Sequence, residues 1–214
     1  MARPATWSDL KSRFVAASDP YIEKLKYGGE ITHWSRPYEY EWLETIIKHL
    51  TAEGDHIIDA GSGPGAPFSK HLGGTRRLIA IDVDEAMPEM KAWRSMVRIR
   101  ADILDENAYS EVPVEHVLSC SVLEHMPPAD IAKFFKTMAK VNPGFLFITL
   151  DVPRVNLTSF FEWARAAGWV PAYGLDTELP FDVLNGLNSI RADQRYEELH
   201  VFRAVLHNPG RKSS

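Results

Sequence analysis

The sequence predicts an α/β fold in which a mostly parallel sheet has helices on both faces and an antiparallel last strand. Short apolar segments rich in β-branched residues alternate with segments whose apolar residues recur at helical spacing. A glycine-rich turn follows the first of these strands directly, which is typical of a buried strand that turns into a helix. The last two strand-like segments lack a clear crossover helix between them, and this favours antiparallel pairing.

The elements follow one another in a regular order. A first helix is expected from Pro37 to about Leu50, because apolar residues recur at helical spacing and proline suits a first helical turn. Strands are then predicted at 56–59, 77–82, 96–100, 115–121 and 144–151, with helices at 66–72, 84–95, 129–140 and 157–167. Segments 170–175 and 198–207 are predicted to form an antiparallel pair at the sheet edge.

The chain of 214 residues is expected to form one main domain over residues 37–210. Residues 1–36 have mixed composition, several aromatic residues and the pair Gly28-Gly29. We therefore interpret them as a helical N-terminal extension that packs on the domain. No repeat or low-complexity linker divides the rest of the chain.

Composition limits the partners and the compartment. The formal net charge is −5 at pH 7, so a nucleic acid partner is not favoured and a small-molecule substrate is. Cys120 is the only cysteine, which excludes an intramolecular disulfide and suits a reducing compartment, so we expect the cytoplasm. No apolar run approaches the roughly 20 residues of a membrane helix, and the N-terminus lacks a secretory apolar segment. The oligomeric state is not predicted.

The glycine turn "DAGSGPG", residues 59–65, is the strongest indication of a ligand. Glycine permits positive φ and a close approach of a ligand to the backbone. The segment also reads Gly61-x-Gly63-x-x-Ala66, which is the dinucleotide fingerprint, and Asp82 follows about 20 residues later, where a ribose-binding acid is expected. Dinucleotides and S-adenosylmethionine both remain possible ligands at this point, beside a turn without a ligand.

Three features separate these ligands. Asp59 precedes the glycines, where a carboxylate would repel a pyrophosphate but could meet a cationic end of a cofactor. Asp102 and Ile103 follow the third strand, where an acid can accept from an adenine amino group and an aliphatic side chain can cover the ring. The fourth strand continues into "SCSVLEHMPP". All three favour S-adenosylmethionine.

These motifs resemble the class I S-adenosylmethionine-dependent methyltransferases, in particular the small-molecule group with a Leu-Glu-His motif after the fourth strand. The matching segments are "DAGSGPG" (59–65), "AIDVDEAM" (80–87), "RADILD" (100–105), "SVLEHMPP" (121–128) and "NPGFLFITLD" (142–151). The resemblance covers about residues 40–206. It implies a Rossmann-like seven-stranded sheet whose antiparallel last strand lies beside the fifth.

The resemblance also implies roles for individual residues. The methionyl part of S-adenosyl-L-methionine is expected at Asp59, Gly61, Ser62, Gly63 and Gly65, with Cys120 or Ser121. Asp82 is expected to hold the ribose, with Val83 among the cofactor-binding residues, and Asp102 with Ile103 to hold the adenine. In this family the segment before the first helix often folds over the cofactor. Arg36 is therefore expected to pair with the methionyl carboxylate, and Trp34 to shield the sulfonium from within a lid. Alternatively, the aromatic residues of this segment pack against the core and Arg36 is solvated.

His125 is the candidate catalytic base, because it follows the fourth strand and a histidine can take a proton at neutral pH. Alternatively, His125 and Glu124 cap the loop or the next helix. Asp151 ends the fifth strand and is either a turn carboxylate or a substrate contact. The other histidines show no ligand spacing, so no metal is expected.

The function predicted is methyl transfer to an oxygen, nitrogen or carbon of a small molecule. An NAD-dependent oxidoreductase is the second candidate, although the sequence lacks a Tyr-x-x-x-Lys pair. A protein that binds the cofactor without transferring a methyl group is the third.

Overall fold

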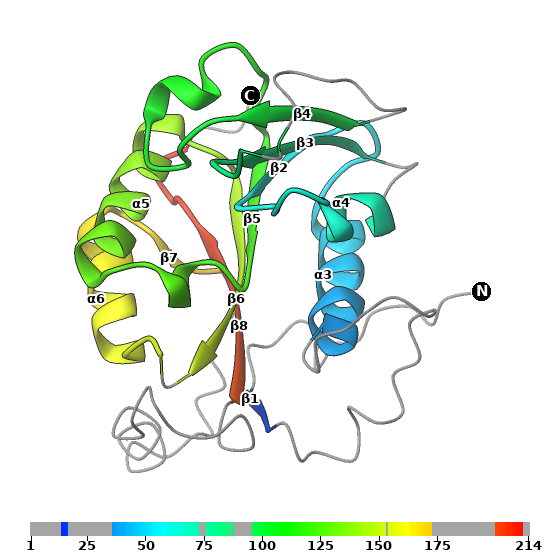
Figure 1. Cartoon of the computed structure of the whole chain (residues 1–214). Coiled ribbons are helices and arrows are strands. Elements are labelled where there is room, and N and C mark those ends of the chain that lie inside the picture. Colours follow the sequence, from blue (N-terminus) through cyan, green and yellow to red (C-terminus); the bar gives the residue numbers. More distant parts are fainter. Residues whose placement is uncertain are drawn as a thin grey trace.

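The computed structural model describes residues 14–16, 36–72, 76–85, 87, 96–152, 154–172 and 200–211. One sheet runs through the molecule in the order β1-β8-β6-β5-β2-β3-β4, with the short β7 paired to β8 (Figure 1). The strands are β1 (Phe14–Ala16), β2 (His56–Ala60), β3 (Arg77–Asp82), β4 (Met96–Arg100), β5 (His116–Cys120), β6 (Phe145–Val152), β7 (Val170–Pro171) and β8 (His200–His207). Strands β2 to β6 are parallel to one another, and β8 is antiparallel to β6.

The predicted fold class is confirmed, since the seven predicted strands correspond to β2–β8. The predicted pairing of segments 170–175 and 198–207 is a small part of the antiparallel pairing of the tail. Among the described residues of 170–175, Val170 and Pro171 pair with β8, whereas β6, the fifth predicted strand, pairs with β8 along its whole length, as the family resemblance implied. Strand β8 is also not the edge, because β1 pairs with its other side.

Strand β1 was not predicted. The expected N-terminal extension was helical, but Phe14–Ala16 form a strand against residues 200–202. The other residues before Arg36, most of the helix expected at 84–95, and residues 173–199 lie outside the described residues. The extension and its lid role therefore stay predictions.

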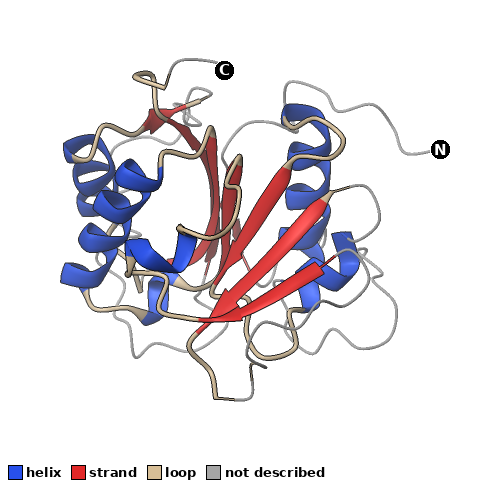
Figure 2. Ribbon diagram, turned by 90° about the horizontal axis from the view of Figure 1, so that it is seen from above, coloured by secondary structure: helices blue, strands red, loops and turns tan. Residues whose placement is uncertain are grey.

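Helices cover both faces of the sheet, as expected (Figures 1 and 2). Helices α3 (Arg36–Leu50) and α4 (Pro67–Leu72) lie on one face, and α5 (Pro128–Val141) and α6 (Leu157–Ala166) on the other. Two 3-10 turns, η1 (Glu106–Tyr109) and η2 (Leu123–His125), follow β4 and β5. Among the described helices, none is long and apolar enough to cross a membrane.

Alternating strand residues supply the two cores. Ile57 and Leu118 pack under α3 and α4, whereas their neighbours Ile58 and Val117 pack under α5 and α6. Because both faces are covered, β2 and β5 are almost entirely buried, which explains why most of their side chains are apolar. The sheet is thus a rigid frame for the loops at its edges.

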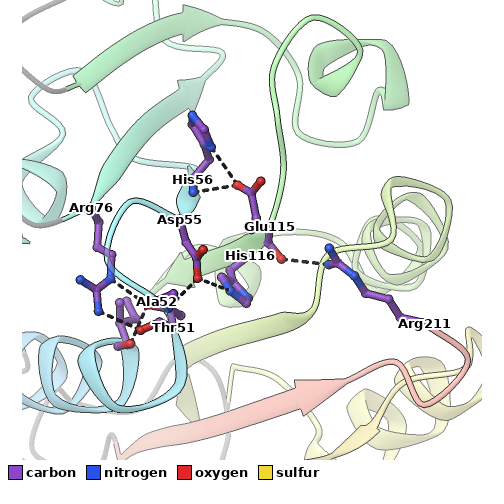
Figure 3. A network of polar contacts seen from close by, with 9 residues as sticks. Thr51, Ala52, Asp55, His56, Arg76, Glu115, His116 and Arg211 are labelled. Carbon is purple, nitrogen blue, oxygen red and sulfur yellow. Dashed lines mark hydrogen bonds and ion pairs between the residues drawn. The ribbon is translucent and has the colours of Figure 1, made fainter. Parts of the chain in front are cut away.

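Crossed polar contacts join β2 and β5 at their amino ends (Figure 3). The backbone N–H of His56 donates to Glu115 Oε2 over 2.7 Å, and His56 Nδ1 lies 2.9 Å from the same oxygen. In return, His116 Nε2 lies 3.2 Å from Asp55 Oδ2. Each acid precedes one histidine in sequence and contacts the other, because the two strands are adjacent and parallel. These contacts fix the relative register of the two central strands.

We expect the burial of His116 to make the protein sensitive to acid. Burial lowers the pKa of His116 below its usual value, although the contact with Asp55 opposes this shift. The unfolded chain therefore binds the proton more readily, so stability present above about pH 6.5 is lost as pH falls toward the folded-state pKa. In urea unfolding at pH 7.5 and 5.5, His116→Gln should lose less stability on acidification than the wild type. His49→Gln, on an exposed site of α3, is the control, and equal losses in all three proteins would contradict this role.

Candidate functional site at the carboxyl ends of the strands

The carboxyl ends of β2, β3, β5 and β6 meet at one edge of the sheet, opposite the histidine contacts. The glycine turn leaves β2 there, with φ of +78° at Gly61 and +68° at Gly63. A Cβ on Gly61 would lie 2.6 Å from the methyl groups of Val122, so only glycine fits between the turn and the loop after β5. At Gly63 an added Cβ would meet nothing within 4 Å. The backbone of Gly63 therefore borders open space.

Asp82 at the end of β3 fixes the glycine turn. Its Oδ2 accepts from the backbone N–H of Gly63 over 2.7 Å, and its Oδ1 accepts from the N–H of Asp84 over 2.9 Å. A carboxylate has about four lone-pair positions, so each oxygen can accept one further hydrogen bond. Asp82 is thus held in place with acceptor capacity left for a ligand.

The residues expected at the adenine end lie in different surroundings. Val83 is 61% exposed, and among the described residues it is the one large hydrophobic side chain that is exposed. Asp102 is exposed, and its Oδ1 accepts from the N–H of Leu104. Ile103 is buried in the core under α5, so its predicted contact with an adenine ring has no support from the position of its side chain. That contact stays a prediction.

Asp59 is buried beneath the turn. Its Oδ2 accepts from the Ser69 hydroxyl of α4 over 2.7 Å. Burial raises the pKa of Asp59 to about 6, although the hydrogen bond from Ser69 opposes the rise. Asp59 therefore joins β2 to α4, and any contact with a ligand would use its remaining acceptor positions.

Glu39, which the sequence analysis did not single out, is the most connected acid of the site. It lies on α3, is fully buried, and its Oε1 accepts from the hydroxyls of Ser121 and Thr149, each over 2.5 Å. Its Oε2 accepts from Arg36 Nη1 over 2.6 Å. Glu39 thereby ties α3 to the carboxyl ends of β5 and β6. Its position on the same helical face as Leu43 and Ile46 is the signal that could have revealed it.

Arg36 and Cys120 belong to the same cluster. Burial, the largest single effect, opposes the charge of Arg36, but the charge and hydrogen bond of Glu39 together with the charges of Cys120 and Tyr40 raise the pKa of the arginine. Cys120 Sγ lies 4.0 Å from Arg36 Nη1, and burial raises the pKa of the thiol well above its usual value. The thiol therefore stays protonated at neutral pH. Trp34, expected beside Arg36, lies outside the described residues.

Ser121 begins the loop after β5 in an unusual conformation. Its φ is +51°, a region that residues other than glycine seldom adopt. The hydrogen bond to Glu39 and that from its backbone N–H to the Thr149 carbonyl (3.0 Å) hold it there. Such strain is typical of functional sites, where the surrounding structure maintains it.

Glu124 and Asp151 are two further buried acids near this loop. Glu124 lies in η2, which packs against β6, the strand of Asp151. Burial, followed by the charge of Asp151, raises the pKa of Glu124 to about 8. Burial, followed by the charge of Glu39, raises the pKa of Asp151 to about 6. At neutral pH, Asp151 is thus mainly ionised and Glu124 mainly protonated.

His125, the predicted base, is exposed at the end of η2. Its Nδ1 lies 3.4 Å from Arg154 Nη1. Partial burial and the charge of Arg154 lower the pKa of His125, so the ring is neutral at pH 7. Within the described ranges, no group of three or more His, Cys, Asp or Glu side chains is placed to hold a metal ion.

Comparisons with known proteins agree on one kind of protein. No protein-family model matches the chain. A protein of Mycolicibacterium smegmatis named as a probable S-adenosylmethionine-dependent methyltransferase is 26% identical over 198 residues, which span 84% of this chain and 75% of that protein. A TehB-like S-adenosylmethionine-dependent methyltransferase from Corynebacterium glutamicum superposes with a TM-score of 0.56 at 14% identity, covering 77% of this chain and 86% of the other.

A geranyl diphosphate methyltransferase solved in complex with S-adenosylmethionine superposes with a TM-score of 0.51 at 15% identity, covering 90% of this chain and 94% of the other. This chain therefore has the Rossmann-like fold of the class I S-adenosylmethionine-dependent methyltransferases.

Proposed function

We infer that this chain is an S-adenosylmethionine-dependent methyltransferase that transfers the methyl group to an oxygen, nitrogen or carbon of a small molecule. The single observation that carries this conclusion is the contact between Gly63 and Asp82. It joins the glycine turn to a carboxylate that keeps free acceptor positions, beside the open space at Gly63 and the exposed Val83. A nucleoside fits this combination, since its ribose hydroxyls donate and its base needs an apolar surface.

The described residues fit the cofactor at its other end as well. The methionyl part would lie against Gly61, Ser62, Gly63 and Gly65, next to Ser121. Asp59 would lie beneath this turn. Arg36 is oriented by Glu39 through a single Nη1 contact, so its other N–H groups could pair with the methionyl carboxylate. Val83 and Asp102 would border the adenine.

When bound, S-adenosylmethionine supplies a sulfonium methyl group that an acceptor atom takes by in-line displacement, leaving the electron pair of the broken bond on sulfur. The chain's task is to hold the acceptor close, exclude water and remove its proton. The rigid strand ends perform the first task. For the last, we assign His125, whose pKa is lowered by partial burial and by the charge of Arg154, so that the neutral ring has a lone pair that can accept the proton.

Replacing Asp82 tests the cofactor site. Asp82→Ala should weaken binding of S-adenosylmethionine by 10- to 100-fold, about 1.4–3 kcal/mol, because charge-assisted hydrogen bonds to the ribose are lost. Isothermal titration calorimetry measures this change. Glu85→Ala is the control, because Glu85 is a nearby acid whose side chain is 92% exposed. Unchanged affinity in Asp82→Ala would remove Asp82 from the site.

The reaction itself can be tested without knowing the acceptor. The purified chain, S-adenosylmethionine and the small-molecule fraction of a cell extract should yield S-adenosylhomocysteine. Product formed only with the macromolecular fraction would contradict a small-molecule acceptor. Tight binding of the cofactor without product in either fraction would favour a protein that binds it without methyl transfer, and binding of NAD instead would favour the oxidoreductase.

A further inference from the structure

Glu124 is buried without the hydrogen bonds that a buried acid normally makes. Glu124 is only 7% exposed. Neither of its carboxyl oxygens has a hydrogen-bond partner in the described part of the chain. Its own backbone N–H lies near enough to oppose the rise of its pKa, but this does not satisfy both oxygens. Burying an unsatisfied polar group costs about 1–3 kcal/mol. An unsatisfied buried group in a native protein calls for an explanation, such as a catalytic role or a bound water or ion.

Asp151, on β6, is a second buried acid with an unsatisfied carboxyl oxygen. It is 4% exposed, and its Oδ1 has no partner among the described residues. Thr149 and Asp151 are two residues apart on β6 and so project from the same face, toward α3. Asp151 therefore lies beside the Glu39 cluster. The electrostatic coupling of Glu124 to Asp151, Glu39 and Arg36 brings all of these groups to the same end of the sheet.

Glu39 differs from these two acids because both of its carboxyl oxygens accept hydrogen bonds. Ser121, Thr149 and Arg36 donate to it, and its ion pair with Arg36 cancels its charge. Arg154, the other nearby cation, is exposed and contacts His125. Arg154 and Arg36 only partly offset the charge of Asp151, whose pKa stays raised. Among the described residues near this loop, Asp151 and Glu124 are therefore the buried acids whose carboxyl oxygens still lack donors. A ligand that completes the site must donate hydrogen bonds and carry positive charge.

We propose that Glu124 and Asp151 form the acceptor subsite and bind a protonated amino group, so that the methyl acceptor is a small-molecule amine. This inference rests on the proposed methyl transfer. The ammonium group binds between the two carboxyl groups and loses one proton to His125, which frees its lone pair. The new nitrogen–carbon bond replaces the carbon–sulfur bond of the sulfonium, and the products are a methylated ammonium group, S-adenosylhomocysteine and one proton.

Matched pairs of simple compounds test this proposal by binding. The probes are propylamine, benzylamine and ethylenediamine against propanol, benzyl alcohol and ethylene glycol, each added to the protein saturated with S-adenosylhomocysteine. We expect at least one amine to raise the melting temperature and its alcohol not to do so. The same amine should accept a radiolabelled methyl group from S-adenosylmethionine. Alcohols that bind as well as the amines, or amines that all fail to bind, would overturn the proposal.

Variants locate the binding. Asp151→Asn removes a charge and Glu124→Gln removes the ability to ionise beside a bound ammonium group, while both keep the shape of the side chain. Each should weaken amine binding at least 10-fold while S-adenosylhomocysteine affinity changes less than 3-fold. Glu162→Gln, on an exposed site of α6, should bind the amine normally. Amine binding that is unaffected by both substitutions would overturn the subsite.

The failure of this inference can be told from a failure of the proposed function. Product formed from the small-molecule extract without binding of any amine leaves the methyltransferase intact and overturns the amine acceptor alone. Absence of cofactor binding in the wild-type protein overturns both. Retained affinity of the two variants for S-adenosylhomocysteine shows that they are folded, so a lost amine signal cannot come from unfolding.

Discussion

The turnover number of His125→Ala is expected to be about 10²–10⁴-fold lower than that of the wild type, with cofactor affinity changed only a few-fold. A base acts on the proton that leaves in the transition state, and it adds little to binding. The neutral ring of His125, maintained by burial and by Arg154, is suited to this role. Turnover is measured as S-adenosylhomocysteine formed with the small-molecule extract, and affinity by calorimetry.

His125→Gln separates this role from a structural one. Glutamine can make hydrogen bonds but cannot accept a proton at neutral pH, so it should be nearly as inactive as alanine. If His125 only caps the loop, alanine should lower the melting temperature and glutamine should restore stability and activity. Among the described residues, the His125 ring contacts an arginine side chain and not a backbone group, which favours the base. A stable, fully active His125→Ala would remove His125 from the mechanism.

Glu39→Ala is expected to lower the free energy of unfolding by about 3 kcal/mol, because breaking a buried ion pair leaves its partner without compensation. Arg36 would lose its carboxylate, and the hydroxyls of Ser121 and Thr149 would lose their acceptor. Cofactor affinity should fall as well, since Arg36 and the loop after β5 are no longer held in place. Urea unfolding and calorimetry measure the two effects.

Two variants serve as controls. Glu44→Ala, on the same helix, removes a partly exposed ion pair with Lys48 and should cost less than about 1 kcal/mol. Glu39→Gln keeps an acceptor for the two hydroxyls but loses the charge opposite Arg36, so its stability should lie between those of the wild type and Glu39→Ala. A loss in Glu39→Ala as small as that in Glu44→Ala would mean that Glu39 does not hold the site together.

The sequence by itself determined the parts of this protein that depend on local pattern. Strands β2, β3 and β5 are short, mainly apolar runs because parallel strands covered on both faces bury side chains on both sides. The glycine turn was also evident from the sequence, as a glycine-rich segment directly after a strand. The structure gives the physical reason at Gly61, where only glycine fits against Val122 and readily adopts the positive φ. Asp82 followed from its spacing after this turn, and the structure places it in contact with Gly63.

The tertiary structure alone decided which distant residues meet. Glu39 and Thr149 are 110 positions apart, and helical periodicity indicates which face of α3 is buried but not which strand end it contacts. The main partner of β8 likewise depends on the order of strands across the sheet; no local pattern contains it, and only the family resemblance implied it. The raised pKa values of Glu124 and Asp151 arise from burial and from charges on other elements. Burial and charge coupling depend on distances in space, and the fold sets those distances.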